Sequence, residues 1–265
     1  MNPIAFQIGP LSVHWYGLLI GLGILLALGL VYQESKRRKL NPDTVLDGCI
    51  YMLPFAFLGA RLYYVVFNFS WYWENPSEIL KVWHGGLAIH GGVLVGLVFL
   101  VFYAKKKHLV PLELLDILAP AVVLAQAIGR WGNFVNQEAH GSPVSESFIA
   151  RFPSFIQRGM LIDGVYYHPT FLYESLWNMG VFLFLMLLTR KSPRPHGKIL
   201  AAYLGLYSLG RFFIEDLRTD SLMYGPFQVA RMVSLIGMVL AVVILCWLYC
   251  NPSALASRKN NQDQS

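Results

Sequence analysis

The chain has 265 residues, of which 55% are hydrophobic and only 14% are charged, and its mean hydropathy is +0.48. A chain of this length could form one or two water-soluble domains, but so few charged residues exclude an ordinary water-facing surface. The formal net charge of +6 would allow a nucleic-acid or anionic-lipid partner until the positions of the basic residues are considered.

Seven apolar segments are long enough, or nearly so, to cross a bilayer as helices, because about 20 apolar residues cover about 30 Å of hydrocarbon. No Lys or Arg precedes the first segment, so we expect a retained helix rather than a cleaved signal peptide. The pattern predicts an all-α integral membrane protein, with residues 1–265 in a single polytopic membrane domain. The segments are residues 13–33, 48–69, 86–104, 114–132, 171–189, 199–214 and 229–250, and the sixth is the shortest.

Basic residues are distributed very unevenly between the loops on the two sides of these segments. Because cytoplasmic loops collect Lys and Arg, the asymmetry predicts an outer N-terminus and a cytoplasmic C-terminus. This topology explains the positive net charge, so we expect no nucleic-acid partner. It makes residues 133–168 a small outward-facing loop or head region and residues 251–265 a disordered cytoplasmic tail. The predicted inner loops carry Lys36, Arg37, Arg38, Lys39, Lys105, Lys106, Lys107, Arg190, Lys191, Arg194, Lys198, Arg258 and Lys259, whereas the outer loops carry only Lys81, Arg151, Arg158 and Arg218.

Polar and ionisable residues gather at the predicted outer ends of five segments. Such residues are costly inside a bilayer and mark a site, a relay or an internal ion pair. A transporter is the main alternative, but it predicts charges along a whole path through the membrane, and here only Asp116 lies deep on the inner side. A purely structural subunit would have no pocket at all. The residues at the outer ends are Tyr16, His90, Arg130, Asn133, Glu138, His168, Tyr173, Glu174, Arg211, Glu215 and Arg218.

The stretch 129–141 places a guanidinium, amides and a carboxylate between small residues. Arg130 is a candidate for phosphate binding, because a guanidinium contacts phosphate as a bidentate fork and glycines let a headgroup approach the backbone. The alternative is that Arg130 extends to the membrane interface or pairs with Glu138.

Two His-Gly-Gly units, beginning at His84 and His90, precede and open the third segment. Glycines at a helix start can expose N–H donors to an anion, and a histidine there can accept a proton near neutral pH. The alternative is a hydrogen-bonded packing histidine, which we favour for His84.

Arg211, Glu215 and Arg218 share one helical face if the sixth helix continues that far, because they are spaced i, i+4 and i+7. They could form a self-contained ion-pair ladder. Two cations with one anion also leave a positive charge, which suits a phosphate-bearing lipid. We expect Glu174 to balance one of the arginines.

Cys49, Cys246 and Cys250 all lie in apolar stretches, without a CxxC motif or histidines at zinc-ligand spacing. We therefore interpret them as packing residues. The sequence shows neither a metal-ligand constellation nor a nucleotide motif, and we expect no metal and no cofactor.

These motifs together resemble the bacterial prolipoprotein diacylglyceryl transferase family. Residues 129–141 match the family signature Gly-Arg-x-Gly-Asn-Phe-x-Asn-x-Glu-x-x-Gly throughout. Further matches are spread over nearly the whole chain. They are Trp15-Tyr16-Gly17, Gly59-Ala60-Arg61-Leu62, His90-Gly91-Gly92, His168-Pro169-Thr170 with Leu172-Tyr173-Glu174, and Tyr207 through Gly210-Arg211 to Glu215 and Arg218.

The resemblance implies a seven-span enzyme of the bacterial cytoplasmic (inner) membrane whose active site faces outward. Its partners are phosphatidylglycerol, membrane lipid and a preprolipoprotein signal peptide with a lipobox cysteine. It implies transfer of the diacylglyceryl group from phosphatidylglycerol to that cysteine as a thioether, with release of glycerol phosphate, as the first step of lipoprotein maturation. The nucleophilic thiol then belongs to the substrate.

By the same resemblance, Arg130 and Arg211 bind the phosphate and stabilise its charge as it leaves. A free cysteine has a pKa of about 8.5, so a base or a nearby positive charge is needed to form thiolate. His90 is the candidate base, or a positioning residue if another group accepts the proton. The residues that complete the headgroup pocket or orient the arginines are Tyr16, Asn133, Glu138, Gly141, Tyr207, Glu215 and Arg218.

Overall fold

The computed structural model describes residues 1–190 and 195–251. Four of the basic residues used for the topology (Lys191, Arg194, Arg258 and Lys259) lie outside the described residues, as does the predicted tail from residue 252 onward. The chain forms two compact units, one of Met1–Leu30 with Leu115–Ser265 and the other of Val31–Leu114. Each unit is described below by itself.

Six helices in the described residues are long and apolar enough to cross a membrane. A further helix, α9 (Lys198–Glu215), covers the predicted sixth segment but is not among the six, and its 18 residues include Lys198, Arg211 and Glu215. The predicted helical membrane fold is therefore confirmed. The six are α1 (Trp15–Arg37), α2 (Pro42–Phe67), α4 (Ile89–Lys106), α5 (Pro111–Asn136), α8 (Thr170–Arg190) and α10 (Val229–Cys250).

The helix ends follow local capping signals that hydrophobicity alone does not show. Helix α2 begins six residues before the predicted segment, because the Asn41 side chain accepts hydrogen bonds from the N–H groups of Asp43 and Thr44 and Pro42 fits the first turn. Helix α5 continues four residues past the predicted end, to Asn136. For α10 the predicted and observed ends coincide.

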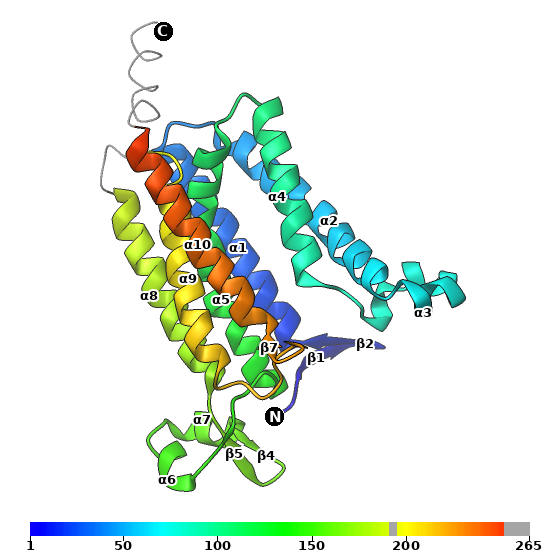
Figure 1. Cartoon of the computed structure of the whole chain (residues 1–265). Coiled ribbons are helices and arrows are strands. Elements are labelled where there is room, and N and C mark those ends of the chain that lie inside the picture. The colour runs from blue at the N-terminus through cyan, green and yellow to red at the C-terminus, as the bar shows by residue number, and fades with distance from the viewer. Residues whose placement is uncertain (191–194, 252–265) are drawn as a thin grey trace, which may run out of the picture. The chain divides into compact units, whose positions relative to one another are not determined.

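In the first unit, α5, α8, α9 and α10 form a bundle with the N-terminal part of α1 (Figure 1). Its apolar centre joins α5, α8 and α9. Small residues allow the close helix approaches that packing in lipid requires. One example is Gly23 of α1, where an added Cβ would lie 3.4 Å from the backbone of Ala125. The buried central residues are Ala119, Val123, Val181, Leu185 and Ile199.

Asp116 has a structural role at the end of the bundle where α9 begins. Its two carboxylate oxygens accept hydrogen bonds from the backbone N–H groups of Gly197 and Leu200, both at 2.8 Å. Gly197 is the N-cap residue of α9 and Leu200 lies in its first turn, where backbone N–H groups have no intrahelical partners. The one deep acidic residue that could have suggested a transport path therefore caps a helix.

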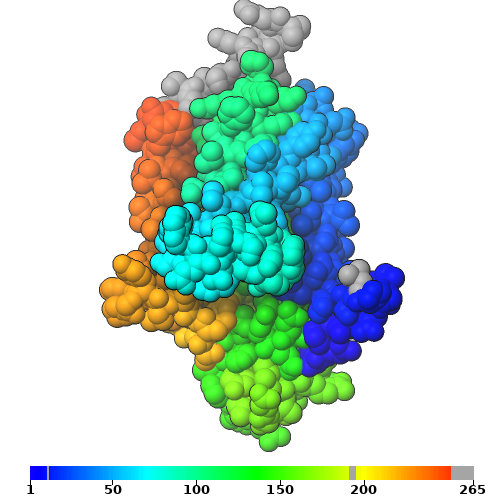
Figure 2. Space-filling view, turned by 90° about the vertical axis from the view of Figure 1, so that its right-hand side faces the viewer, coloured from blue at the N-terminus to red at the C-terminus, as the bar shows by residue number. Residues whose placement is uncertain are grey.

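A small head region lies between α5 and α8 and protrudes from one end of this bundle (Figures 1 and 2). It contains α6 (Glu146–Ile149), α7 (Ser154–Gly159) and an antiparallel sheet of β3 (Pro143–Val144), β5 (Val165–Tyr167) and β4 (Leu161–Ile162), in that order. Its buried core also takes one residue from each flanking helix, so the head is fixed to α5 and α8. The core residues are Phe134, Ile149, Ile156, Met160 and Phe171.

Two short hairpins complete the first unit. Strands β1 (Ile4–Ile8) and β2 (Leu11–His14) pair before α1, and β6 (Met223–Tyr224) and β7 (Phe227–Gln228) pair between α9 and α10. Cys246 and Cys250 are exposed on α10, whereas Cys49 of α2 is buried. The interpretation of all three as packing residues is therefore wrong for the two on α10, an apolar helix whose outer surface suits lipid.

The second unit is built on α2 and α4, which pack through glycines. An added Cβ on Gly91 would collide with the carbonyl oxygen of Gly59, and one on Gly92 would lie 3.1 Å from the carbonyl oxygen of Ala56. The glycines of the second His-Gly-Gly unit therefore permit close contact between the two helices. Between the two helices lie α3 (Phe69–Glu74) and the 3-10 turns η1 (Pro76–Leu80) and η2 (Val82–His84).

Candidate functional site

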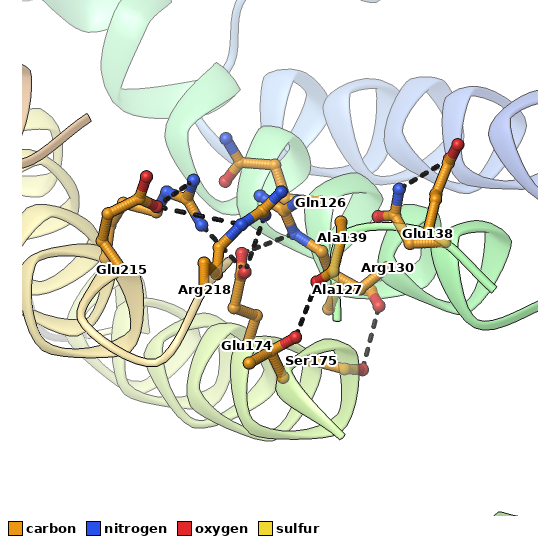
Figure 3. Close-up of polar contacts among 12 residues, drawn as sticks. Gln126, Ala127, Arg130, Glu138, Ala139, Glu174, Ser175, Glu215 and Arg218 are labelled. Atoms are coloured by element: carbon orange, nitrogen blue, oxygen red, sulfur yellow. Dashed lines mark hydrogen bonds and ion pairs between the residues drawn. The ribbon is translucent and has the colours of Figure 1, made fainter. Parts of the chain in front are cut away.

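Three arginines from three parts of the first unit surround the carboxylate of Glu174, near the start of α8 (Figure 3). Arg130 of α5 places its Nε 2.7 Å from one carboxylate oxygen. Arg211 of α9 donates to the other oxygen at 2.8 Å, and Arg218 lies 3.5 Å from that same oxygen. Glu174 is buried. The sequence predicted that it balances one arginine, and it contacts three.

Glu215 is a second buried carboxylate in this cluster. Its Oε2 lies 2.5 Å from Arg211 and 4.0 Å from Nε of Arg218. Helix α9 ends at Glu215, so Arg218 does not continue the helical face that the i, i+4, i+7 spacing required. Arg218 lies in the following turn, and the turn brings it back to Glu174. The arginine cluster (Arg130, Arg211, Arg218, Glu174 and Glu215) carries three positive and two negative charges.

Asp220 adds a half-exposed carboxylate at the edge of the arginine cluster. Its two oxygens accept hydrogen bonds from Nε and Nη2 of Arg218 at 3.0 and 2.9 Å, which is the bidentate geometry typical of an arginine–carboxylate pair. Burial raises the pKa of the Asp220 carboxyl, but the hydrogen bonds and charge of Arg218 outweigh burial and hold it below its ordinary value. No sequence motif pointed to Asp220, because it lies in a loop that the helical spacing does not reach.

The signature stretch 129–141 positions the arginine cluster against α8. Trp131 donates its indole N–H to the Ser175 hydroxyl at 3.1 Å, and that hydroxyl donates to the carbonyl of Ala127 at 2.9 Å. Thr170, the first residue of α8, donates to the carbonyl of Ala139 at 2.7 Å. These bonds fix the end of α5 to the start of α8, which are the helices that carry Arg130 and Glu174.

Glu138 and Asn133 pair with each other. The Asn133 amide donates to Oε1 of Glu138 at 2.9 Å, and the Asn136 amide lies 3.4 Å from the same oxygen. Arg130 pairs with Glu174, so the alternative that Arg130 pairs with Glu138 is wrong. Glu138 instead stabilises the end of α5.

Gly141 lies where three backbone segments meet. Its N–H donates to the carbonyl of His168 at 3.0 Å, and it forms an isolated β-bridge with Arg218. An added Cβ would lie 2.6 Å from the Cβ of His168 and 2.9 Å from the carbonyl oxygen of Leu217. Only glycine fits this contact, which connects the signature stretch directly to the backbone of one of the arginines.

The two predicted tyrosines approach this region from α1 and α9. The Tyr16 ring packs against Gly132, where an added Cβ would lie 2.6 Å from a ring carbon. Tyr207 lies one helical turn before Arg211 and stacks on Tyr203 with 5.6 Å between ring centroids. The hydroxyl of Tyr203 in turn hydrogen-bonds Gln126, at 3.1 Å.

His168 and Tyr173 form a hydrogen-bonded pair beside the arginine cluster, with 3.2 Å between Nδ1 and the hydroxyl oxygen. Burial lowers the pKa of His168, which favours a neutral imidazole. His90 belongs to the second unit, on α4, where its ring centroid lies 6.4 Å from that of Tyr63. The first unit therefore assembles every predicted site residue except His90.

The described residues contain no group of three or more His, Cys, Asp or Glu side chains that could hold a metal ion. What the arginine cluster offers chemically is a set of guanidinium groups held in fixed positions by buried carboxylates. Such a set can bind a phosphate and stabilise the charge that develops on it.

A sequence model of the prolipoprotein diacylglyceryl transferase family matches residues 3–247. The chain is similar to proteins named phosphatidylglycerol–prolipoprotein diacylglyceryl transferase in several clostridia. It is 53% identical over 245 residues to that of Clostridium novyi (strain NT), which covers 92% of this chain and 95% of the relative. For Clostridium botulinum (strain 657 / Type Ba4) the identity is 49% over 245 residues, covering 92% and 98%. For the transferase numbered 1 of Clostridium perfringens (strain 13 / Type A) it is 50% over 249 residues, covering 92% and 94%.

Proposed function

The chain belongs to the prolipoprotein diacylglyceryl transferase family, and from this premise we propose how its own residues carry out the reaction. It is a membrane transferase that moves a diacylglyceryl group from phosphatidylglycerol to a prolipoprotein during lipoprotein maturation. The arginine cluster in the first unit is the observation on which the proposed mechanism depends.

The acceptor in this proposal is the thiol of a lipobox cysteine in the signal peptide of the precursor. Its sulfur forms a bond to the terminal glyceryl carbon of the diacylglyceryl group. The bond between that carbon and the phosphate oxygen breaks, and glycerol phosphate leaves with the electron pair. The thiol proton passes to a base. No oxidant, metal or cofactor enters this balance.

Arg130 and Arg211 bind the phosphate and stabilise the charge that remains on it as the carbon–oxygen bond breaks. Glu174 contacts the Nε of Arg130 at 2.7 Å, and in this proposal the terminal nitrogens of that guanidinium bind the phosphate. Three guanidinium groups face two buried carboxylates in the arginine cluster, and a third carboxylate, the half-exposed Asp220, pairs with Arg218 at its edge. Because its carboxylates are buried, the donors are held in place before the substrate arrives, which is the condition for strong electrostatic stabilisation.

The remaining predicted residues shape the pocket around these arginines. Arg218 and Glu215 complete the charge network, and Gly141 permits the backbone contact that holds Arg218. Tyr16 and Tyr207 contribute rings from α1 and α9. Asn133 and Glu138 hydrogen-bond each other and so fix the end of α5, the helix that carries Arg130.

His90 is proposed as the group that accepts the thiol proton, or as a positioning residue if another group accepts it. A histidine suits the first role because its ordinary pKa, about 6.5, lies close to neutral pH. The positive charge of the arginine cluster assists by stabilising the thiolate, whose formation otherwise requires a pH near about 8.5.

The protein spans the bacterial cytoplasmic membrane seven times as a single polytopic domain, with its N-terminus outside and its C-terminus inside. The proposal counts α9 as a span, because its ionisable residues lie at its ends and leave an apolar stretch of residues 199–210 between them. Lys198 can extend to the inner interface, and Arg211 and Glu215 pair within the protein. The head region and the arginine cluster then lie at the outer face, where phosphatidylglycerol and a secreted precursor meet.

A defined reconstitution tests this function. Purified protein in detergent is incubated with phosphatidylglycerol and a short lipobox peptide, and the peptide mass and the release of glycerol phosphate are followed. We expect a mass gain of one diacylglyceryl group that disappears when the peptide cysteine is replaced by serine. If folded protein binds both substrates and produces neither product, the transferase mechanism is wrong and a binding or transport role replaces it.

A further inference from the structure

The segment between α2 and α4 has one face fixed to the second unit. Arg61 of α2 is buried and donates hydrogen bonds to the backbone carbonyls of Glu78, Ile79, Gly85 and Gly86, at 2.6 to 2.9 Å. These bonds hold both 3-10 turns against the end of α2. On the same side the buried Tyr72 ring lies under the Arg61 guanidinium, with 5.3 Å between the guanidinium carbon and the ring centroid.

The other face of this segment is apolar and exposed. Three of the seven tryptophans of the chain lie within residues 71–83. Trp73, Leu80 and Trp83 are 75%, 80% and 74% exposed. Figure 2 shows this part of the surface in cyan, and Figure 1 shows α3 turning away from the direction of α2. We call the exposed side chains of Phe69, Trp73, Leu80 and Trp83 the aromatic platform.

The ends of the segment place the platform at a particular depth. The segment begins where α2 ends at Phe67 and finishes where α4 begins at Ile89, and both helices are apolar enough to span a membrane. Phe67 and Ile89 are themselves largely exposed, so the apolar surface of the helices continues into the platform. A short segment between two adjacent spans stays close to one membrane–water interface.

The side chains of the platform match the chemistry of that interface. Trp and Tyr are enriched at the level of the lipid headgroups, where their rings are partly apolar and partly hydrogen-bonding. A segment with one fixed face and one exposed apolar face lies in the interface plane with the apolar face toward lipid. Among the charged side chains of the segment, Glu78 pairs with Lys81 at 2.6 Å and with His84 at 2.7 Å, and Glu74 is exposed at the end of α3.

We propose that the aromatic platform binds the headgroup region of the outer leaflet and holds the second unit at a fixed depth in the membrane. This inference depends on the proposed span arrangement, in which α2 and α4 cross the bilayer, and is independent of the transferase chemistry. A precursor peptide or a second copy of the chain are the competing occupants of the same surface.

Fluorescence quenching in vesicles tests the platform. The full chain is reconstituted in phosphatidylcholine vesicles that contain neither phosphatidylglycerol nor precursor, with a nitroxide either on the lipid headgroup or deep on the acyl chain. The native protein is compared with the double variant Trp73→Phe and Trp83→Phe, which keeps aromatic rings at both positions. The matched control is Trp247→Phe, which removes an exposed tryptophan of α10.

We expect the fluorescence that the double substitution removes to be quenched more strongly by the headgroup nitroxide than by the deep one, and weakly by a water-soluble quencher. Strong quenching from water with none from either lipid would overturn the proposal. Quenching that depends on the protein-to-lipid ratio would indicate a second copy of the chain on this surface, and quenching that depends on an added lipobox peptide would indicate the precursor. Either result would also overturn the proposal. Deep quenching of the fluorescence that a Trp177→Phe substitution in α8 removes reports separately whether the spans are embedded, and the peptide assay reports the transferase reaction.

Discussion

The central prediction concerns Glu174, whose carboxylate holds three guanidinium groups together. Glu174→Gln keeps the shape of the side chain and removes its charge. The carboxylate is 4% exposed, and the side chains of Arg130, Arg211 and Arg218 are 21%, 16% and 11% exposed. Removing one partner of a buried ion pair costs about 3–5 kcal/mol, because the remaining charge is left buried and uncompensated. We expect the unfolding equilibrium constant to rise by about two to three and a half orders of magnitude.

The loss of activity should exceed the loss of folded protein, because the same change releases Arg130 and Arg211 from their fixed positions. The measurements are unfolding of the purified protein in mixed detergent and turnover of the lipobox peptide by the fraction that remains folded. The matched control is Asp220→Asn, since Asp220 is half exposed and its carboxylate pairs with Arg218. A partly exposed pair contributes roughly 1 kcal/mol or less. If Glu174→Gln is as stable and as active as Asp220→Asn, the arginine cluster does not depend on Glu174 and the reasoning is refuted.

Three further predictions follow from the same contacts. Arg130→Lys keeps the charge but loses the planar fork, so we expect folded protein in the membrane without transferase turnover, and near-normal turnover would contradict the proposed role. Gly132→Ala places a Cβ 2.6 Å from a ring carbon of Tyr16 and should cost about 1–3 kcal/mol of stability and raise KM, which unfolding and initial-rate measurements check. The pKa of Asp220 is lowered by Arg218, so the stability that this pair adds is present above the ordinary value of 3.8 and lost as pH falls through the lower folded value. The stability difference between the native protein and Asp220→Asn should therefore disappear in acid.

Much of the fold was predictable because a membrane imposes a simple rule on the sequence. A span needs a long apolar stretch, and all seven predicted stretches are helices in the structure. The signature stretch was equally visible, since its glycines, amides and charges lie close together in the chain. Helix ends were less predictable, as Asn41 shows, because a cap depends on local hydrogen bonds that hydrophobicity does not report.

The arrangement of the arginine cluster was not predictable from spacing. The i, i+4, i+7 pattern grouped Arg211, Glu215 and Arg218 on one helix, but the helix ends at Glu215 and the following turn directs Arg218 toward Glu174. Likewise, proximity in sequence favoured Glu138 as a partner for Arg130, whereas the structure supplies Glu174 from 44 residues away. Local spacing predicts partners only while one helix continues.

The sequence by itself determined which segments are helical and apolar, and it indicated which residues could carry the chemistry. Only the tertiary structure decided that Glu174 joins three arginines, that Asp116 caps a helix whose N-cap residue lies 81 residues later, and that Arg61 holds a loop in place. The physical reason is that a charge in a low-dielectric interior must be compensated by whichever partner packing brings within hydrogen-bonding distance. Packing joins helices that are far apart in the chain, and the residue pattern of a single helix does not specify that partner.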